Sequence, residues 1–410
     1  MGGARYAAPL AVAAWFAVGC GGRYTEGLPN ADDTGNTGKA ATGAESAGGA
    51  ASISGGMAAG NGVALGNAMA GNAAVSTTGG TATTLGGGIA GVGATSGGAS
   101  PGGVTAGGGT VYVGAGRSAT VLAQGLKRPT ALVVYGGKLY FADFGTDYYD
   151  GSVWELPLDA SGPLVPVAQA QRGPDGLAVD ATGVYWSAQA LMRASLDGTN
   201  QTQLVTGTVN DPIAVGPSGV YGTGSVAGSL TTVVRVPLAG GSLSALALPS
   251  SLGRSMQSYG FALDATSVYW TTFDDPTSIK KMPLEGGTPQ TLATTPGAGG
   301  GIVLHGGNAY WVASSAVMSV PTAGGTAVAL APSSTTIAGG DNIAVDDANV
   351  YWTTTNSVMK ASLGGGPAEV LASDLPAPAP IAVDATSVYW GTTSTLHGLA
   401  AGTIMRLTPK

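Results

Sequence analysis

From about residue 126 onward, short apolar runs alternate with polar turns, and an aromatic pair recurs at a nearly regular distance. Runs such as Ile-Ala-Val-Asp, or the shorter Ala-Leu-Asp, end at four aspartates: Asp180, Asp264, Asp346 and Asp384. The aromatic pairs are Tyr140-Phe141, Tyr185-Trp186, Tyr269-Trp270, Tyr310-Trp311, Tyr351-Trp352 and Tyr389-Trp390, with a degenerate copy at Tyr221-Gly222. The seven tyrosines are 45, 36, 48, 41, 41 and 38 residues apart. The average, about 41.5 residues, is the length of a four-stranded propeller blade.

The rest of each unit also reads as β-structure. Residues 357–363 alternate in character, as a half-buried third strand should, and the Gly-rich turn 364–366 follows them. Residues 369–372 then supply a fourth, outer strand. No stretch after residue 109 keeps a helical period. The pattern therefore predicts an all-β fold, a seven-bladed β-propeller.

The two ends of the repeat region predict how the ring closes. The seventh unit ends at residues 403–407 and has no fourth strand of its own. Residues 121–126, just before the first unit, resemble the end of a fourth strand at residues 370–375. We therefore expect the N-terminal strand to complete the last blade and leave no open edge in the ring.

On these motifs, residues 119–410 resemble the YWTD and NHL-type propellers. The Val-Tyr-Trp-Thr sequences that end at Thr271 and Thr353 carry the likeness. The chain departs from the YWTD pattern one residue later, where Thr272 and Thr354 replace the family's aspartate. Only Asp143, after Tyr140-Phe141-Ala142, keeps an acid at that place. The resemblance thus implies the fold, and the family's ligand preferences do not carry over.

Composition changes sharply before the repeats. No aromatic residue lies between Tyr24 and Tyr112, and no charged residue lies between Glu45 and Arg117. Such a segment buries too little apolar surface to offset its conformational entropy. We assign residues 20–108 to a disordered Gly/Ala/Ser/Thr-rich tether and residues 109–410 to the propeller.

Residues 1–19 have the parts of a secretory signal peptide, with an apolar run too short to span a bilayer. The sequence Ala17-Val18-Gly19-Cys20 resembles a bacterial lipobox, and Cys20 is the chain's one cysteine. Lipidation of Cys20 would hold the mature protein on a membrane. Gly21 in place of an aspartate favours the outer membrane, so we expect export to the cell envelope. The alternative is an ordinary signal peptide with Cys20 incidental.

Charge and cysteine content exclude some functions. The net charge is −7, and the 16 Lys and Arg form no basic run in the repeat region, which argues against nucleic acid as a partner. One cysteine allows neither an internal disulfide nor a cysteine-based metal site. We therefore expect no bound cofactor, with Ca²⁺ as the one exception weighed below.

Residues that recur at the same place in several units are interpreted as structural. The four aspartates that end the apolar runs suit a turn in which the carboxylate accepts a backbone hydrogen bond, and not catalysis. The Tyr-Trp pairs are interpreted as packing between blades. His305 takes the turn position that holds aspartate elsewhere, so it is assigned a structural role.

Candidate binding residues are those in loops that interrupt the repeat. The longest such loop supplies Asp143, Asp147, Tyr148, Tyr149 and Asp150; others supply Asp211, Phe273, Asp274, Asp275 and His397. A further long connection spans residues 251–259. Three aspartates within eight residues could ligate Ca²⁺ through oxygen, although they do not match the EF-hand spacing. The alternative is a solvated acidic loop.

Catalytic patterns are scarce. The two histidines, His305 and His397, form no zinc-ligating pair, and no Walker-type loop is present. The favoured hypothesis is a non-enzymatic binding or scaffolding module that recognises a protein or envelope glycan through its loops. The rival is a propeller hydrolase or lyase, resembling gluconolactonases or streptogramin lyases. A lactonase would need an axial glutamate, and the only glutamates after residue 126 are Glu155, Glu285 and Glu369. A third alternative is a purely structural envelope protein.

Overall fold

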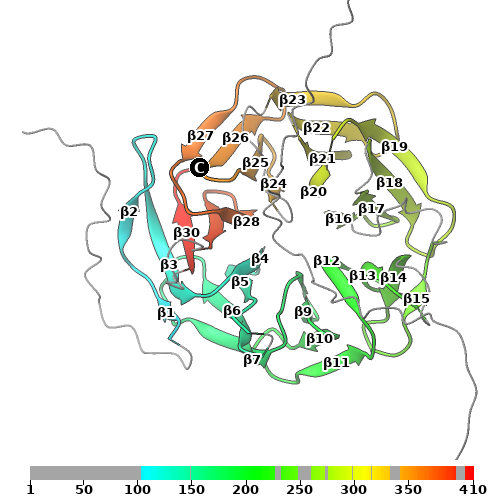
Figure 1. Ribbon diagram of the computed structural model, residues 1–410, viewed down its shortest axis with the longest axis horizontal. Coiled ribbons are helices and arrows are strands. Elements are labelled where there is room, and N and C mark those ends of the chain that lie inside the picture. The colour runs from blue at the N-terminus through cyan, green and yellow to red at the C-terminus, as the bar shows by residue number, and fades with distance from the viewer. Residues whose placement is uncertain are drawn as a thin grey trace, which may run out of the picture. The chain divides into compact units, whose positions relative to one another are not determined.

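The computed structural model describes residues 103–147, 149–226, 232–247, 260–272, 276–297, 299–314, 316–332, 342–393 and 402–410. These residues form seven antiparallel β-sheets and no helix. Figure 1 shows the sheets arranged as blades in a ring. The predicted all-β, seven-bladed propeller is confirmed. Among the residues described, none belongs to a helix long and apolar enough to cross a bilayer.

Each of the first six blades pairs its four strands in chain order, from the centre of the ring outward. Blade 1 contains β4 (Pro129–Tyr135), β5 (Lys138–Asp143), β6 (Gly151–Pro157) and β7 (Val165–Gln171). Blade 2 contains β8 (Leu177–Asp180), β9 (Gly183–Ser187), β10 (Leu191–Ala194) and β11 (Thr202–Val205). Blade 3 contains β12 (Val209–Gly216), β13 (Gly219–Gly224), β14 (Thr232–Val236) and β15 (Ser244–Ala245).

The next three blades repeat this order. Blade 4 contains β16 (Phe261–Leu263), β17 (Ser267–Thr271), β18 (Thr277–Pro283) and β19 (Gln290–Thr295). Blade 5 contains β20 (Gly299–His305), β21 (Asn308–Ala313), β22 (Ala316–Pro321) and β23 (Val328–Pro332). Blade 6 contains β24 (Ile343–Val345), β25 (Asn349–Thr353), β26 (Val358–Ser362) and β27 (Glu369–Ala372).

Blade 7 joins the two ends of the folded region. It contains β28 (Pro378–Val383), β29 (Val388–Thr392) and β30 (Gly402–Leu407), and its fourth strand is β3 (Ser118–Leu126), which pairs with β30. The predicted closure by an N-terminal strand is therefore confirmed.

Two short strands extend blade 7 beyond its fourth strand. Both β1 (Thr105–Ala106) and β2 (Thr110–Tyr112) pair with β3, and the backbone N–H of Gly107 donates to Leu122 O at 2.8 Å between them. These strands cover the edge of β3, which would otherwise be free to pair with a strand of another molecule. β1 lies before the predicted start of the propeller at residue 109, in a Gly-rich stretch without an alternating apolar pattern. The signal peptide, Cys20 and the tether up to residue 102 lie outside the described residues.

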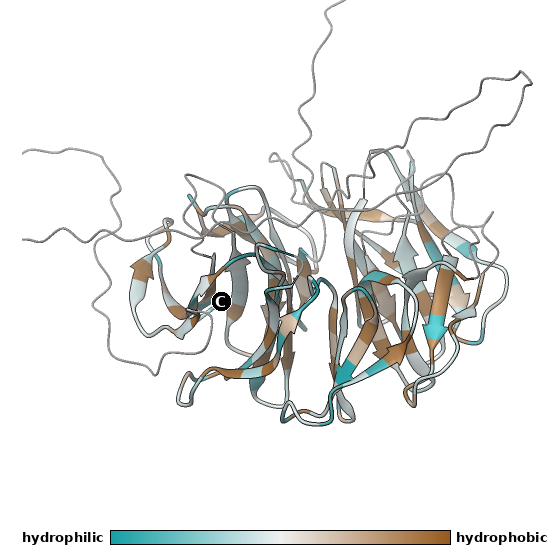
Figure 2. Cartoon of the chain, turned by 60° about the horizontal axis from the view of Figure 1, so that its bottom comes forward, coloured by the Kyte–Doolittle hydropathy of each residue, from teal (hydrophilic) through white to brown (hydrophobic). Residues whose placement is uncertain are grey.

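The aromatic pairs form the contacts between blades. Figure 2 shows hydrophobic stretches running along the strands. In six of the seven interfaces the tyrosine of one blade shares a buried cluster with the residue at the tryptophan position of the next blade, and in the interface of blades 2 and 3, where Gly222 takes that position, Tyr185 clusters with Val220. The pairs are Tyr140 with Trp186, Tyr185 with Val220, Tyr221 with Trp270, Tyr269 with Trp311, Tyr310 with Trp352, Tyr351 with Trp390, and Tyr389 with Phe141. The packing role expected from the spacing is confirmed.

The repeated aspartates shape the turns between first and second strands. In Asp180, Asp264, Asp346 and Asp384, Oδ1 accepts backbone N–H groups two and three residues further on, at 2.7–3.1 Å. In three of these turns, the second carboxylate oxygen also accepts the tyrosine hydroxyl of the next strand: Tyr269 at 2.6 Å, Tyr351 at 2.9 Å and Tyr389 at 2.7 Å. The predicted structural role of these aspartates is confirmed.

Candidate functional site

The antiparallel order of the strands places the blade connections on two opposite faces. Turns from first to second and from third to fourth strand lie on one side. Connections from second to third strand, and from one blade to the next, lie on the other side, here called the long-loop face. Asp143, Asp147, Tyr149, Asp150 and Asp211 all lie on or next to connections of this face. The other predicted site residues, Tyr148, Phe273, Asp274, Asp275 and His397, lie outside the described residues.

Asp143 is held inside its own loop. Its side chain is 3% exposed, and the carboxylate accepts the backbone N–H groups of Lys127 at 3.0 Å and of Arg128 at 2.6 Å. Burial raises the pKa of Asp143 above its ordinary range, although these backbone hydrogen bonds lower it in part. The carboxylate therefore fixes the connection between blades 7 and 1 and presents no free acid at the surface.

The loop between β5 and β6 is closed by Asp150. Its carboxylate accepts the hydroxyl of Thr146 at 2.6 Å and the backbone N–H of Asp147 at 2.9 Å. Desolvation alone would raise the pKa of Asp150, but these hydrogen bonds outweigh it and hold the pKa below the usual value. Asp150 is thus ionised and stabilises the loop through these hydrogen bonds, and Asp147 beside it is exposed.

A cation–aromatic stack lies at the inner end of this loop. The guanidinium of Arg128 lies 3.5 Å from the centroid of the Phe144 ring. Gly173, in the connection to blade 2, packs against the ring's far end: a Cβ added there would lie 2.7 Å from Phe144 Cζ. Phe144 therefore joins the connections that lead into blades 1 and 2.

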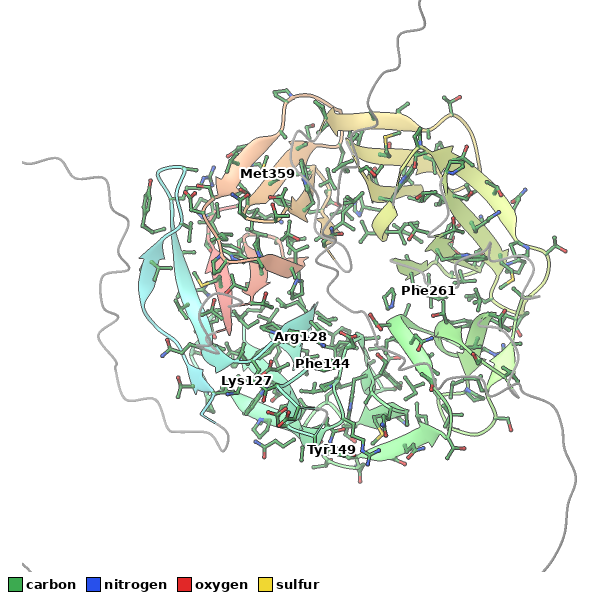
Figure 3. All side chains as sticks on the ribbon, in the orientation of Figure 1. Lys127, Arg128, Phe144, Tyr149, Phe261 and Met359 are labelled. Carbon is green, nitrogen blue, oxygen red and sulfur yellow. The ribbon has the colours of Figure 1, made fainter. Side chains whose placement is uncertain are left out.

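A second stack lies toward the perimeter. The guanidinium of Arg172 lies 4.7 Å from the centroid of the Tyr149 ring and donates from Nη1 to Gln189 Oε1. Tyr149 is 62% exposed. Figure 3 shows Arg128, Phe144 and Tyr149 in the sector of blades 1 and 2, with Arg128 nearest the centre and Tyr149 nearest the rim.

Asp211 adjoins the same sector from blade 3. It lies near the start of β12, is exposed, and precedes a cis peptide bond to Pro212. A Cβ added to Gly176, at the connection into blade 2, would lie 3.2 Å from the Cβ of Asp211. The structure therefore gathers Asp147, Tyr149, Asp150 and Asp211 around the connections of blades 1 to 3.

No metal site is formed by the residues described: no three His, Cys, Asp or Glu side chains among them are grouped to hold an ion. The Ca²⁺ ligation considered for the loop of Asp143, Asp147 and Asp150 stays a prediction, with a solvated acidic loop as its alternative. The three glutamates of the repeat region lie on outer positions. Glu155 pairs with Lys138, Glu285 pairs with Arg235, and Glu369 pairs with Arg117 and Lys360.

Sequence reasoning missed the two arginines of this sector. Arg128 directly precedes the first strand of blade 1, and Arg172 directly follows the fourth strand, so neither falls within a repeat motif. Their position in connections next to the longest loop is the sequence feature that could have pointed to them. Their aromatic partners are 16 and 23 positions away in the chain, which only the fold brings into contact.

We expect Gly173→Ala to cost more stability than Gly136→Ala. Both glycines have φ of +58°, so the backbone strain of an alanine, about 1–2 kcal/mol, is the same. A Cβ at Gly136 meets nothing within 4 Å, whereas at Gly173 it meets Phe144, which adds about 1–3 kcal/mol of overpacking. Urea unfolding of both variants measures the difference. Equal costs would show that Phe144 is not held in this position.

A shallow recess lies elsewhere, at the perimeter between blades 1 and 2. It has a volume of about 390 Å³ and is lined by Pro166, Val167, Ala168, Gln169, Gly198 and Gln201. Gln201 Nε2 spans it with a 2.9 Å hydrogen bond to Val167 O. The recess contains none of the predicted site residues.

Comparison with known proteins supports the fold. No family model matches the chain, and no curated protein matches it. Puromycin hydrolase is similar in structure at 13% identity and a TM-score of 0.54, with 68% of this chain and 52% of that chain covered. The β-propeller domain of Cps50 (Swd1) from Myceliophteria thermophila has 11% identity and a TM-score of 0.52, covering 72% and 98%. U3-55K has 11% identity and a TM-score of 0.52, covering 68% and 95%.

The seven sheets define the class, and these likenesses agree with it: the folded part of this chain is a seven-bladed β-propeller. The chain spans about half the length of puromycin hydrolase. At such identities the similarity shows the fold alone, and the same fold carries many functions.

Proposed function

We propose that this chain is a non-enzymatic binding module of the cell envelope that recognises its ligand through the long-loop face of blades 1 and 2. The observation that carries the proposal is the exposed aromatic ring of Tyr149, 62% exposed and stacked with Arg172 on a loop that interrupts the repeat. Exposed tyrosine and arginine side chains supply most of the energy at many binding surfaces. A propeller offers a rigid frame for such loops.

Anchoring at the envelope is the second part of the proposal. The lipobox-like sequence before Cys20 and the apolar run before it support export and lipidation at the outer membrane. A lipid anchor would leave the long-loop face of a tethered propeller free to meet a protein or an envelope glycan. Mass spectrometry of the protein purified from membranes tests this part, since lipidation adds acyl mass at Cys20 and Cys20→Ser abolishes it.

A hydrolase or lyase is the second candidate, and the described residues favour it less. An axial metal site of the lactonase kind needs a glutamate on an inner strand. Glu155 lies on the third strand of its blade, Glu369 on the fourth, and Glu285 in the turn after the third strand. All three are engaged in ion pairs.

Tyr149→Ala is expected to weaken binding to the envelope ligand by roughly 10-fold or more, as truncation of a central aromatic contact does. Tyr112→Ala is the matched control, because Tyr112 is 72% exposed but lies on β2 at the outer edge of blade 7. Binding of the purified propeller to fractionated envelope protein and polysaccharide measures the effect. Both variants should melt like the parent, since both side chains are exposed. Equal binding by all three proteins would remove the long-loop face of blades 1 and 2 as the binding surface.

A further inference from the structure

Eight of the twelve Lys and Arg in the described residues fall into two groups. On the third strands, five of the seven positions that pair with the repeated tyrosine are Arg or Lys: Arg193, Arg235, Lys281, Lys360 and Arg406. These side chains are used in fixed contacts, such as Lys281 Nζ with Thr322 O in the next blade at 3.0 Å. In the described part of the long-loop face, Lys127, Arg128 and Arg172 are the cations, and all three lie in connections into blades 1 and 2.

Arg128 lacks the ion pair or side-chain hydrogen bond that the other partly buried cations of the described residues have, apart from its neighbour Lys127. No described carboxylate forms an ion pair with its guanidinium, and its buried Nε has no hydrogen-bond acceptor within the described residues. The nearby carboxylate of Asp143 accepts backbone N–H groups instead. A partly buried charge without a counter-ion is costly, and an anionic ligand would remove that cost.

Contacts connect Arg128 to the exposed stack at the rim. Arg128 lies over Phe144, Phe144 packs against Gly173, and Gly173 follows Arg172, which lies over Tyr149. The four side chains Arg128, Phe144, Arg172 and Tyr149 therefore form one strip, here called the stacked strip, across the connections of blades 1 and 2. Figure 3 labels three of them, Arg128, Phe144 and Tyr149.

The neighbouring groups narrow the chemistry of the ligand. Asp147 and Asp150 lie beside the stacked strip, and the hydrogen bonds to Asp150 keep it ionised. Two carboxylates would repel a multiply charged anion but can accept the hydroxyl groups of a sugar. Gln189, which accepts a hydrogen bond from Arg172, adds an amide beside them. The strip thus combines guanidinium donors, hydroxyl acceptors and an open aromatic ring.

We infer that the stacked strip is a subsite for a sugar unit that carries one carboxylate, such as a uronic acid in an envelope polysaccharide. Arg172, which stacks on Tyr149, donates to the carboxylate of this sugar unit, whose planar shape matches the guanidinium fork, and Arg128 at the inner end of the strip donates to the carboxylate of a neighbouring unit. The exposed face of Tyr149 stacks on the C–H face of the sugar ring, and Asp147 accepts its hydroxyl groups. This inference rests on the proposed function and names its ligand class.

Isothermal titration of residues 103–410 with tri-galacturonate, and with the neutral galactose trimer at the same concentrations, tests the inference. We expect the acidic trimer to bind, its affinity to fall with added salt, and the neutral trimer to bind at least 10-fold more weakly. Arg172→Gln and Arg128→Gln should each weaken binding of the acidic trimer at least 10-fold. Because Arg172 is exposed, Arg172→Gln is expected to fold, and it tests the inference even if Arg128→Gln does not fold.

Lys280→Gln is the matched control for loss of one positive charge. Lys280 lies on β18 in blade 4, away from the stacked strip, and its ammonium group donates to Thr291 Oγ1 at 2.8 Å, so its variant should bind within 2-fold of the parent. Equal affinity for the two trimers, or equal loss in Lys280→Gln and Arg172→Gln, would overturn the inference. If the acidic trimer does not bind but envelope ligand binding still depends on Tyr149, the inference fails and the proposed function stands. If Tyr149→Ala has no effect on either, both fail.

Discussion

A chain that begins at residue 127 is expected to lose the folded propeller, whereas residues 103–410 fold and melt cooperatively. Starting at residue 127 removes β3, so β30 loses its pairing partner and blade 7 its fourth strand. Leu122 and Leu126, 1% and 0% exposed, leave the cluster that contains Trp154 of blade 1. Each buried leucine contributes about 2–5 kcal/mol, so the loss approaches the whole net stability of a typical domain, about 5–15 kcal/mol.

An intermediate chain, residues 118–410, separates closure from edge protection. It keeps β3 but lacks β1, β2 and Arg117, which pairs with Glu369 of blade 6. It also lacks Val113, which is buried against blade 6. We expect it to fold with a lower melting temperature than residues 103–410. Circular dichroism melts of the three chains give the order, and a cooperative melt of 127–410 at the parent's temperature would refute closure by β3.

Asp346→Ala is expected to destabilise the propeller by about 2–4 kcal/mol, because one carboxylate serves several donors. It accepts two backbone N–H groups and the hydroxyl of Tyr351 at 2.9 Å. It also pairs with Lys410 Nζ at 2.6 Å, and the Lys410 side chain is only 9% exposed. Removing the carboxylate leaves Tyr351 and Lys410 without this acceptor inside the junction of blades 6 and 7.

The stabilisation by the Asp346 carboxylate depends on pH. Desolvation raises the pKa of Asp346, but the hydrogen bonds from Lys410, Ala348 and Asn349 dominate and lower it to about 2. An unfolded aspartate titrates near pH 3.9, so the stabilisation is complete above that value and is lost as the pH falls toward 2. The pKa values of Asp264 and Asp384 are lowered in the same direction. Parent and variant should therefore converge in stability between about pH 4 and pH 2.

Asp347→Ala is the control for this measurement. Asp347 is fully exposed and pairs with His305 at 3.1 Å, so solvent screens the pair and its loss should change the free energy of unfolding far less than loss of Asp346. Urea unfolding of both variants from pH 7 to pH 2 gives the comparison. A gap between the parent and Asp346→Ala that stays constant across the acid range would show that the ionised carboxylate is not the stabilising group.

Much of the fold could be predicted because propeller stability depends on local and periodic features. The tyrosines from Tyr140 to Tyr389 recur with the blade, since each must fill the same space between neighbouring sheets. Turn chemistry is equally local: an aspartate such as Asp384 reaches backbone groups only two and three residues away. Strand β1 could not be predicted because the Gly-rich sequence around it, including Gly107, shows no alternation of apolar and polar side chains. The pairing of β1 with β3 depends on backbone hydrogen bonds, which nearly any sequence can form.

The candidate site was predictable only in part, for the same physical reason. Asp147, Tyr149 and Asp150 could be identified as exposed residues of one face because they lie in a loop that interrupts the repeat. The sequence likewise could not show that Asp143 is buried, because its partners are backbone groups of the connection before blade 1.

By itself, then, the sequence determined the number of blades, their order and the closure of the ring, because spacing and alternation repeat in every unit. The tertiary structure alone decided that Arg128 stacks on Phe144 and Arg172 on Tyr149. Those contacts join connections of adjacent blades, and their positions depend on how the sheets pack around the ring, which no local pattern encodes.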